Sequence, residues 1–125
     1  MNIGLASIVV NDPLEAFEFY TKILGFKERM YMPEYKLAIV VSPEAQNGTG
    51  LLLEPNENPI SSTYQSALYN TGIPVITLGT DNIEMEFERL KALGVVFRQE
   101  PTKTDWGTEA VFDDTCGNFV QIFQV

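Results

Sequence analysis

The sequence lacks histidine altogether and has a single cysteine among its 125 residues. Histidine is the commonest general base and metal ligand near neutral pH, so a histidine-based catalytic triad is excluded. Cys116 cannot form an internal disulfide, which favours a reducing compartment. Basic residues are also few: eight stand against 17 acidic ones, a net charge of −9. This charge disfavours nucleic acid as a partner.

Long apolar runs are missing as well. No stretch approaches the ~18 apolar residues of a membrane span, and the first residues lack the basic-then-apolar layout of a signal peptide. We therefore expect a cytoplasmic protein without a membrane partner. What is present is ordinary for a globular chain, with 45% hydrophobic and 20% charged residues. The length suits one domain, residues 1–125.

A repeated segment organises the chain. DPLEAFEFYTKILGF begins at Asp12, and DNIEMEFERLKALGV begins at Asp81, 69 residues later. Both segments have apolar residues at helical spacing, and each predicts a helix. In the first copy, Asp12 suits the N-cap, Pro13 the first turn and Gly25 the C-terminal cap.

Strand patterns surround both helices. In the first half, one candidate strand precedes the helix and three follow it, at 3–10, 26–32, 35–42 and 50–54. The second half repeats this order, at 74–79, 95–99, 108–113 and 119–125. The pattern predicts an α+β fold of two tandem βαβββ modules, which form a curved sheet cup. The modules are expected at 1–54 and 72–125, with 55–71 as a linker containing about one helical turn near 64–69.

Several motifs carry a resemblance to a known family. They are the DPxxAxxFYxxxLGF helix, the Leu93-Gly94 end of the second helix, Trp106-Gly107, and an FDDxxGN segment at 112–118 followed by alternating apolar residues. The chain resembles the vicinal oxygen chelate superfamily, which includes glyoxalase I, extradiol dioxygenases, fosfomycin-resistance enzymes and bleomycin-resistance proteins. The resemblance implies the cup fold, and it implies a homodimer in which modules complete each other's cups.

The same resemblance implies a metal site, with a histidine on the first strand of a module and a glutamate on the last. The corresponding positions are Leu5 and Leu51 in the first module, and Val75, or its neighbour Pro74, and Gln121 in the second. A divalent ion needs several N, O or S donors, and one amide among aliphatic groups cannot supply them. We therefore expect no metal and no cofactor at the usual site.

Strand alternation extends these positions into a predicted ligand-binding face. Trp106 either stacks on a planar ligand at the edge of the cup or anchors its own loop to the sheet. Tyr35, together with Tyr31 and Met32, either forms an opposite wall or contacts a partner subunit. The predicted ligand-binding residues are Leu5, Ser7, Leu51, Leu53, Val75, Thr77, Trp106, Phe119, Gln121, Phe123 and Tyr35.

Three functions are compatible with these residues. The first is a metal-free small-molecule binding protein, resembling bleomycin-resistance proteins, that sequesters an apolar or aromatic ligand; the acidic charge favours a cationic one. The second is a glyoxalase-like lyase or related enzyme, with an atypical metal site or metal-independent carboxylate chemistry. The third is an interaction module whose cup is filled by its own side chains. No catalytic residue can be assigned from the sequence.

Overall fold

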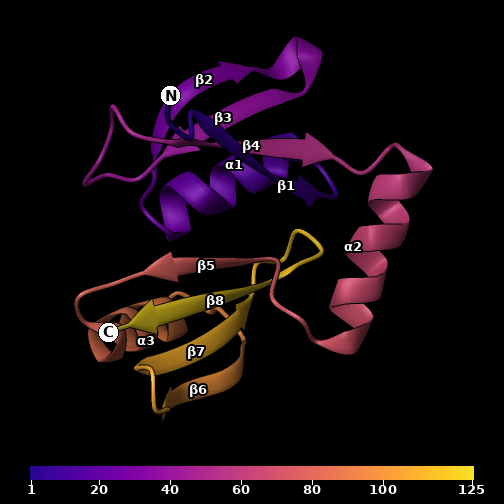
Figure 1. Cartoon of the computed structure of the whole chain (residues 1–125). Coiled ribbons are helices and arrows are strands. Elements are labelled where there is room, and N and C mark those ends of the chain that lie inside the picture. Colours follow the sequence, from indigo (N-terminus) through magenta and orange to yellow (C-terminus); the bar gives the residue numbers. More distant parts are fainter. The chain divides into compact units, whose positions relative to one another are not determined.

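The computed structural model describes all residues, 1–125, and consists of two compact units, Met1–Gln65 and Ser66–Val125. We call them the first and the second unit and describe each by itself (Figure 1). The first unit contains β1 (Leu5–Val10), α1 (Pro13–Glu18), the π-helix η1 (Phe19–Ile23), β2 (Lys27–Met32), the 3-10 turn η2 (Pro33–Tyr35), β3 (Leu37–Val41) and β4 (Gly50–Pro55).

The sheet of the first unit has the strand order β1-β4-β3-β2. Strands β1 and β4 are parallel, whereas β3 pairs antiparallel with both β4 and β2. The helix begins as predicted, because the Asp12 side chain accepts a hydrogen bond from the Leu14 N–H at 2.9 Å. It ends before Gly25, whose φ of +90° is a conformation that glycine adopts without strain.

The last turns of this helix differ from the prediction of a regular α-helix. The N–H of Leu24 donates to the carbonyl of Phe19, five residues earlier, at 3.1 Å. Such a π-helical segment inserts one extra residue per turn and has no sequence signal comparable to a cap.

Helix α2 (Pro59–Thr71) corrects the prediction for the linker, where about one helical turn was expected. Its start is set by Asn58, whose side chain accepts from the Ile60 N–H at 2.8 Å, and by Pro59 in the first turn. The helix has no apolar stripe, since Gln65 is its one buried residue. Periodicity therefore missed it, although the Asn-Pro start and Gly72 beyond its end were readable signals.

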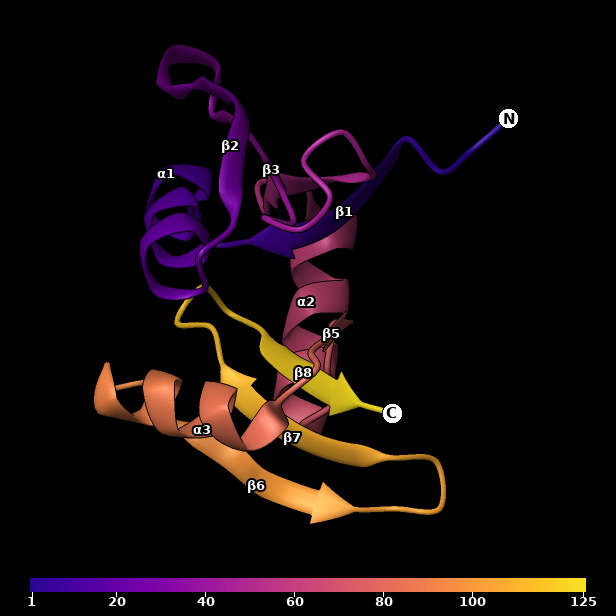
Figure 2. The same cartoon turned by 90° about the vertical axis from the view of Figure 1, so that its left-hand side faces the viewer.

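The second unit repeats the topology of the first. Its sheet has the order β5-β8-β7-β6, with β5 and β8 parallel and the other pairs antiparallel. The two tandem βαβββ units of an α+β fold are thus confirmed. Helix α3 packs against β6, β7 and β8 (Figure 2). The elements are β5 (Ile76–Gly79), α3 (Ile83–Ala92), β6 (Phe97–Lys103), β7 (Thr108–Asp113) and β8 (Phe119–Gln124).

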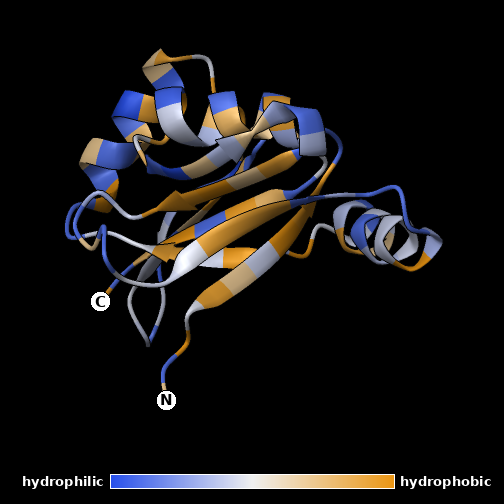
Figure 3. Ribbon diagram, turned by 90° about the horizontal axis from the view of Figure 1, so that it is seen from above, coloured by the Kyte–Doolittle hydropathy of each residue, from blue (hydrophilic) through white to orange (hydrophobic).

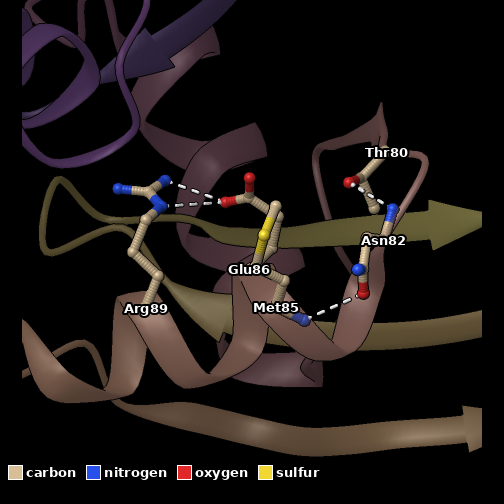
Figure 4. Close-up of polar contacts among 5 residues, drawn as sticks. All are labelled: Thr80, Asn82, Met85, Glu86 and Arg89. Carbon is tan, nitrogen blue, oxygen red and sulfur yellow. Dashed lines mark hydrogen bonds and ion pairs between the residues drawn. The ribbon is translucent and has the colours of Figure 1, made fainter.

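Helix α3 starts one residue later than its repeat partner suggested. Asn82, rather than Asp81, is the N-cap, and its side-chain oxygen accepts from the Met85 N–H at 3.1 Å (Figure 4). Figure 4 also shows Arg89 donating to Glu86, three residues earlier on the same helix. The connection between the strands predicted at 95–99 and 108–113 is shorter than expected, because β6 continues to Lys103.

Each unit has its own core between its sheet and its helix. The hydrophobic residues concentrate on the strands, whereas the helices carry both kinds (Figure 3). None of the helices has the length and apolar character that a membrane crossing requires. Fully buried side chains include Val10, Tyr20, Val40 and Leu53 in the first unit and Leu90, Phe112 and Val120 in the second.

Candidate functional site

The sheet of the first unit has one face under α1 and one face opposite to it, which we call the first open face. On β1, Ile8 and Val10 are buried, whereas Leu5 is 48% exposed. Residues paired across a parallel ladder point to the same side, and successive residues alternate. The ladder pairs Leu5 with Gly50, Ser7 with Leu52 and Val9 with Glu54. The first open face therefore consists of Leu5, Ser7, Val9, Lys27, Met30, Met32, Leu37, Ile39, Val41, Gly50, Leu52 and Glu54.

Leu51 and Leu53 do not belong to this face, which corrects the prediction. They pair with Ala6 and Ile8, and their exposed fractions are 9% and 0%. Both are core residues under the helix. The error is a register shift of one residue, which moves every side chain of a strand to the other side of the sheet.

The ladders explain where this shift arose. Ser7 pairs with Leu52, and Thr77 pairs with Gln121. The first strands of the two units therefore correspond at an offset of 70 residues, but the last strands correspond at 69, as the helices do. The repeat counterpart of Gln121 is Leu52, and the prediction had taken Leu51.

The face of the second sheet opposite α3, which we call the second open face, has the predicted residues of β5 and β8. Thr77 pairs with Gln121, and the Val75 N–H donates to the Phe119 carbonyl at 2.9 Å. Val111 of β7 lies beside Gln121, and Gln99 of β6 beside Val111. The second open face consists of Val75, Thr77, Gly79, Gln99, Thr102, Glu109, Val111, Asp113, Phe119, Gln121 and Phe123.

One end of the second open face is filled by aromatic packing. The ring of Tyr69 stacks on Phe119, with centroids 4.5 Å apart and planes at 3°. The guanidinium of Arg98 lies 5.2 Å from the centre of the Phe119 ring. The Tyr69 hydroxyl donates to Asp113 Oδ2 at 2.6 Å. This hydrogen bond raises the pKa of Tyr69 above its usual value, with smaller contributions from burial and from the negative charges of Asp113 and Asp114.

The corresponding end of the first open face has an arginine packed over a glycine instead of an aromatic cluster. A Cβ on Gly50 would lie 2.8 Å from Nη1 of Arg29 and 3.2 Å from the Leu5 side chain. The other terminal nitrogen of Arg29, Nη2, donates to the carbonyls of Gln46, at 3.1 Å, and Gly48, at 2.6 Å. A hollow of about 570 Å³ adjoins this guanidinium and is lined by Asn2, Ile3, Gly4, Asn47, Gly48 and Thr49.

Glu54 places a carboxylate at the opposite end of the first open face. It pairs with Val9, so its side chain lies on the same side as Leu5 and Ser7. The side chain is partly exposed and makes neither a hydrogen bond nor an ion pair. Glu54 was missing from the predicted face, because the register error assigned that face of β4 to Leu51 and Leu53, which point to the other side.

The open faces do not have the donor set of a divalent metal site. The positions implied by the family, after the register correction, are Leu5, Leu52, Val75 and Gln121, of which only Gln121 carries a donor atom. No group of three His, Cys, Asp or Glu residues is close enough together to hold an ion. The residues present therefore do not fit the metal of the metalloenzyme relatives, and no chemistry is assigned through one.

The aromatic residues predicted for the edge of the site differ in their surroundings. Trp106 is 85% exposed in the turn between β6 and β7, so the interpretation as a loop anchor was wrong. Tyr35 is also well exposed, in η2. Tyr31 stacks on Phe17 of α1, with centroids 4.0 Å apart, and so belongs to the helix side of the sheet instead of a wall of the open face.

The FDDxxGN motif has a structural role. Asp114 is fully buried in the connection from β7 to β8, and its Oδ1 accepts from the N–H groups of Cys116, at 2.7 Å, and Asn118, at 3.0 Å. The Asn118 side chain donates to the other oxygen at 3.1 Å. Gly117 has a φ of +97°. The motif closes a tight turn, and Cys116 is buried inside it.

Two βαβββ units, each with a helix on one sheet face and an open second face, define a known class of fold. The family model of the Glyoxalase/Bleomycin resistance protein/Dioxygenase superfamily matches residues 2–122. The chain belongs to this superfamily.

Individual relatives cover the chain almost completely. YurT of Bacillus subtilis (strain 168) is 48% identical over 126 residues, which are 99% of either chain. The crystal structure of UcmS2 has a TM-score of 0.81 at 30% identity and covers 98% of this chain and 97% of its own. TnmS3, an antibiotic binding protein from Streptomyces sp. CB03234, has a TM-score of 0.78 at 26% identity, with 99% and 95% covered.

Proposed function

We propose that this protein binds an apolar or aromatic small molecule on its open sheet faces, without a resident metal, and thereby sequesters it. The observation that carries the proposal is the chemistry of the four positions Leu5, Leu52, Val75 and Gln121. Three hydrocarbon side chains and one amide favour burial of an apolar ligand over coordination of an ion.

The solved relatives support binding over catalysis. TnmS3 is an antibiotic binding protein, and its fold covers this chain almost entirely. A binding protein needs no reactive group, only apolar surface and a few oriented polar groups. The open faces offer this combination, with no histidine anywhere in the chain to act as a general base.

Binding would combine burial, orientation and charge. Each 100 Å² of apolar surface removed from water contributes roughly 2.5 kcal/mol. Thr77 and Gln121, paired on the second open face, supply a hydroxyl and an amide for orientation. The indole of Trp106 is free to stack on a planar ligand. The net charge of −9 favours a cationic group in that ligand, an effect that salt weakens.

We further propose that the protein works in the cytoplasm as a homodimer. Large apolar side chains such as Ile60 and Tyr64 of α2 are exposed one helical turn apart, as expected of a surface that a second copy covers. Sedimentation equilibrium across a concentration series tests this. A monomer at every concentration would overturn the dimer.

The binding proposal is tested by a thermal-shift screen of aromatic antibiotics and metabolites. We expect at least one compound to raise the melting temperature of the wild-type protein, since a ligand that binds only the folded state stabilises it. The variant Leu52→Asp, which puts a charge on the first open face, should lose a shift that arises there. Leu93→Asp, at an exposed turn position, is the matched control. No shift across a broad panel would contradict the proposal.

A separate measurement addresses the metal. The purified protein is incubated with Ni²⁺, Zn²⁺, Mn²⁺ or Fe²⁺, dialysed, and analysed for bound metal. We expect substoichiometric metal and no change in melting temperature. Stoichiometric metal, or a turnover that a chelator abolishes, would contradict the sequestration proposal and favour a glyoxalase-like enzyme.

A further inference from the structure

We infer that the first open face selects a zwitterionic ligand, an elongated apolar molecule with an anionic group at one end and an amine at the other. The inference rests on the proposed function and names its ligand class. It follows from two opposite charges at the two ends of strand β4, with an apolar surface between them.

Arg29 marks the anionic end of the ligand. Its Nη2 is held by the two carbonyls of the loop, whereas its Nη1 and Nε make no hydrogen bond. The unused Nη1 packs against Gly50, where the absent side chain makes room for it, and the hollow lined by residues 2–4 and 47–49 adjoins the same arginine. Lys27 adds a second positive charge in the same row, since it pairs with Val41, which pairs with Gly50. A guanidinium with free donors beside an open hollow suits a carboxylate or phosphate.

The repeat shows that this end is open in one unit only. Arg98 is the counterpart of Arg29 at an offset of 69, and Phe119 is the counterpart of Gly50. In the second unit the Phe119 ring, stacked on Tyr69, occupies the space next to the arginine. The first unit has a glycine there, so its guanidinium remains accessible.

Glu54 marks the cationic end. Its carboxylate has no partner in the protein, although an ionised carboxylate on an apolar face gains from a nearby positive charge. Glu54 lies four residues beyond Gly50 on the same strand and the same face, a separation of about 13 Å at the rise of a β-strand.

The surface between the two charges is almost entirely hydrocarbon. Leu5, Val9 and Leu52 lie along it, with the Ser7 hydroxyl as its polar group. A ligand that follows β4 would therefore bury an apolar chain in the middle and place a charge at each end. A molecule with a single charge would leave one of the two protein charges unpaired.

The test uses four unbranched probes of similar length: 11-aminoundecanoate, undecanoate, undecylamine and 1-undecanol. Their affinities for the full-length protein are measured by isothermal titration calorimetry at low salt. We expect 11-aminoundecanoate to bind tightest. Its affinity should exceed those of undecanoate and undecylamine, which lack one of its charges, by roughly fivefold, as for a partly exposed ion pair.

Charge-neutral variants assign each end. Arg29→Gln should weaken 11-aminoundecanoate and undecanoate roughly fivefold and leave undecylamine unchanged, and Arg29→Lys should recover most of the loss. Glu54→Gln should weaken 11-aminoundecanoate and undecylamine to the same extent and leave undecanoate unchanged. Lys22→Gln in η1 and Glu15→Gln in α1 make the same changes in net charge and should leave all four affinities unchanged.

The outcomes separate this inference from the proposed function. If 1-undecanol binds as tightly as 11-aminoundecanoate and the variants leave all affinities unchanged, the selection of a zwitterionic ligand is overturned. The proposed binding of apolar molecules would then still stand. If none of the probes binds, both fail on this face. Loss of probe binding as the protein concentration rises, with dimer forming in gel filtration, would show a second copy as the occupant and would also overturn the inference.

Discussion

The two units place an arginine at matching positions, and the difference between them lies beneath its guanidinium. Arg29 and Arg98 both occupy an irregularity of the outer strand, where the ladder shifts register. Arg29 lies over Gly50, and Arg98 lies near the ring of Phe119. At this position the first unit has a glycine packed against its arginine, whereas the second unit has a phenylalanine in an aromatic cluster. A duplicated fold does not imply a duplicated binding site.

The rest of the two open faces follows the same contrast. Leu52 corresponds to Gln121, and Glu54 corresponds to Phe123, again at an offset of 69. The first open face is hydrocarbon with a charge at each end, whereas the second combines aromatic rings, amides at its centre and the carboxylates of Glu109 and Asp113. Three stability measurements test this contrast between the units, and their expected effects decrease in the order given.

The largest effect tests the assignment of the faces themselves. Leu53→Ala should lower the free energy of unfolding by about 2 to 5 kcal/mol, because Leu53 is fully buried under α1. Leu52→Ala, one residue away on the open face, should cost less than about 1 kcal/mol. Urea denaturation measures both. Similar costs for the two neighbours would mean that the register, and with it the comparison of Leu52 with Gln121, is wrong.

The second effect compares the connections that lead into the last strand of each unit. Asp114→Ala removes the buried acceptor of three hydrogen bonds and should cost about 2 to 3 kcal/mol. Arg29→Gln removes only exposed bonds to the loop carbonyls and should cost less than about 1 kcal/mol.

Asp105→Ala is the control for Asp114→Ala, since it removes the same charge from an exposed turn. Its free energy of unfolding should stay within about 0.5 kcal/mol of the wild type. If Arg29→Gln destabilised the protein as much as Asp114→Ala, the guanidinium would be a structural element of its loop, and the contrast between a free and a packed arginine would disappear.

Much of the fold was predictable, because it depends on local signals. Asp12 and Gly25 fix the ends of the first helix, and the alternation of apolar residues defines the strands. Helix α2 was not predicted at its full length, because its apolar residues neither alternate nor form a stripe, and only Gln65 is buried. Local capping at Asn58 and Pro59 was its one signal, and such signals are weak without periodicity.

The site was predictable only in part, for a geometric reason. A strand has a period of two residues, so an error of one residue in aligning the repeat exchanged Leu52 for Leu51 and hid Glu54. The packing of Arg29 against Gly50 and the stack of Tyr69 on Phe119 depend on residues distant in the sequence. No sequence pattern joins Arg29 to Gly50, because tertiary packing alone brings them together.

The smallest effect concerns the hydrogen bond that holds the packed end of the second open face. Tyr69→Phe keeps the ring on Phe119 and removes only the hydroxyl that donates to Asp113. We expect a loss of about 1 kcal/mol at pH 7, measured by urea denaturation. Gly50, the counterpart of Phe119, has no tyrosine ring stacked on it. Loss of the Tyr69 hydroxyl should therefore loosen the packed end of the second open face.

The pH dependence gives this loss its signature. The pKa of Tyr69 is raised in the folded protein, because its neutral hydroxyl donates to the Asp113 carboxylate and ionisation would place two negative charges together. The hydroxyl therefore contributes its full stabilisation below the pKa of an unfolded tyrosine, about 10, and loses it as the pH rises through the higher folded value. The difference between wild type and Tyr69→Phe should stay constant from pH 7 to 9 and shrink at pH 11. Tyr64→Phe, on the exposed side of the same helix, is the control and should show no such difference at any pH. If the difference in free energy of unfolding between wild type and Tyr69→Phe stayed constant up to pH 11, ring packing rather than this hydrogen bond would stabilise that end of the sheet.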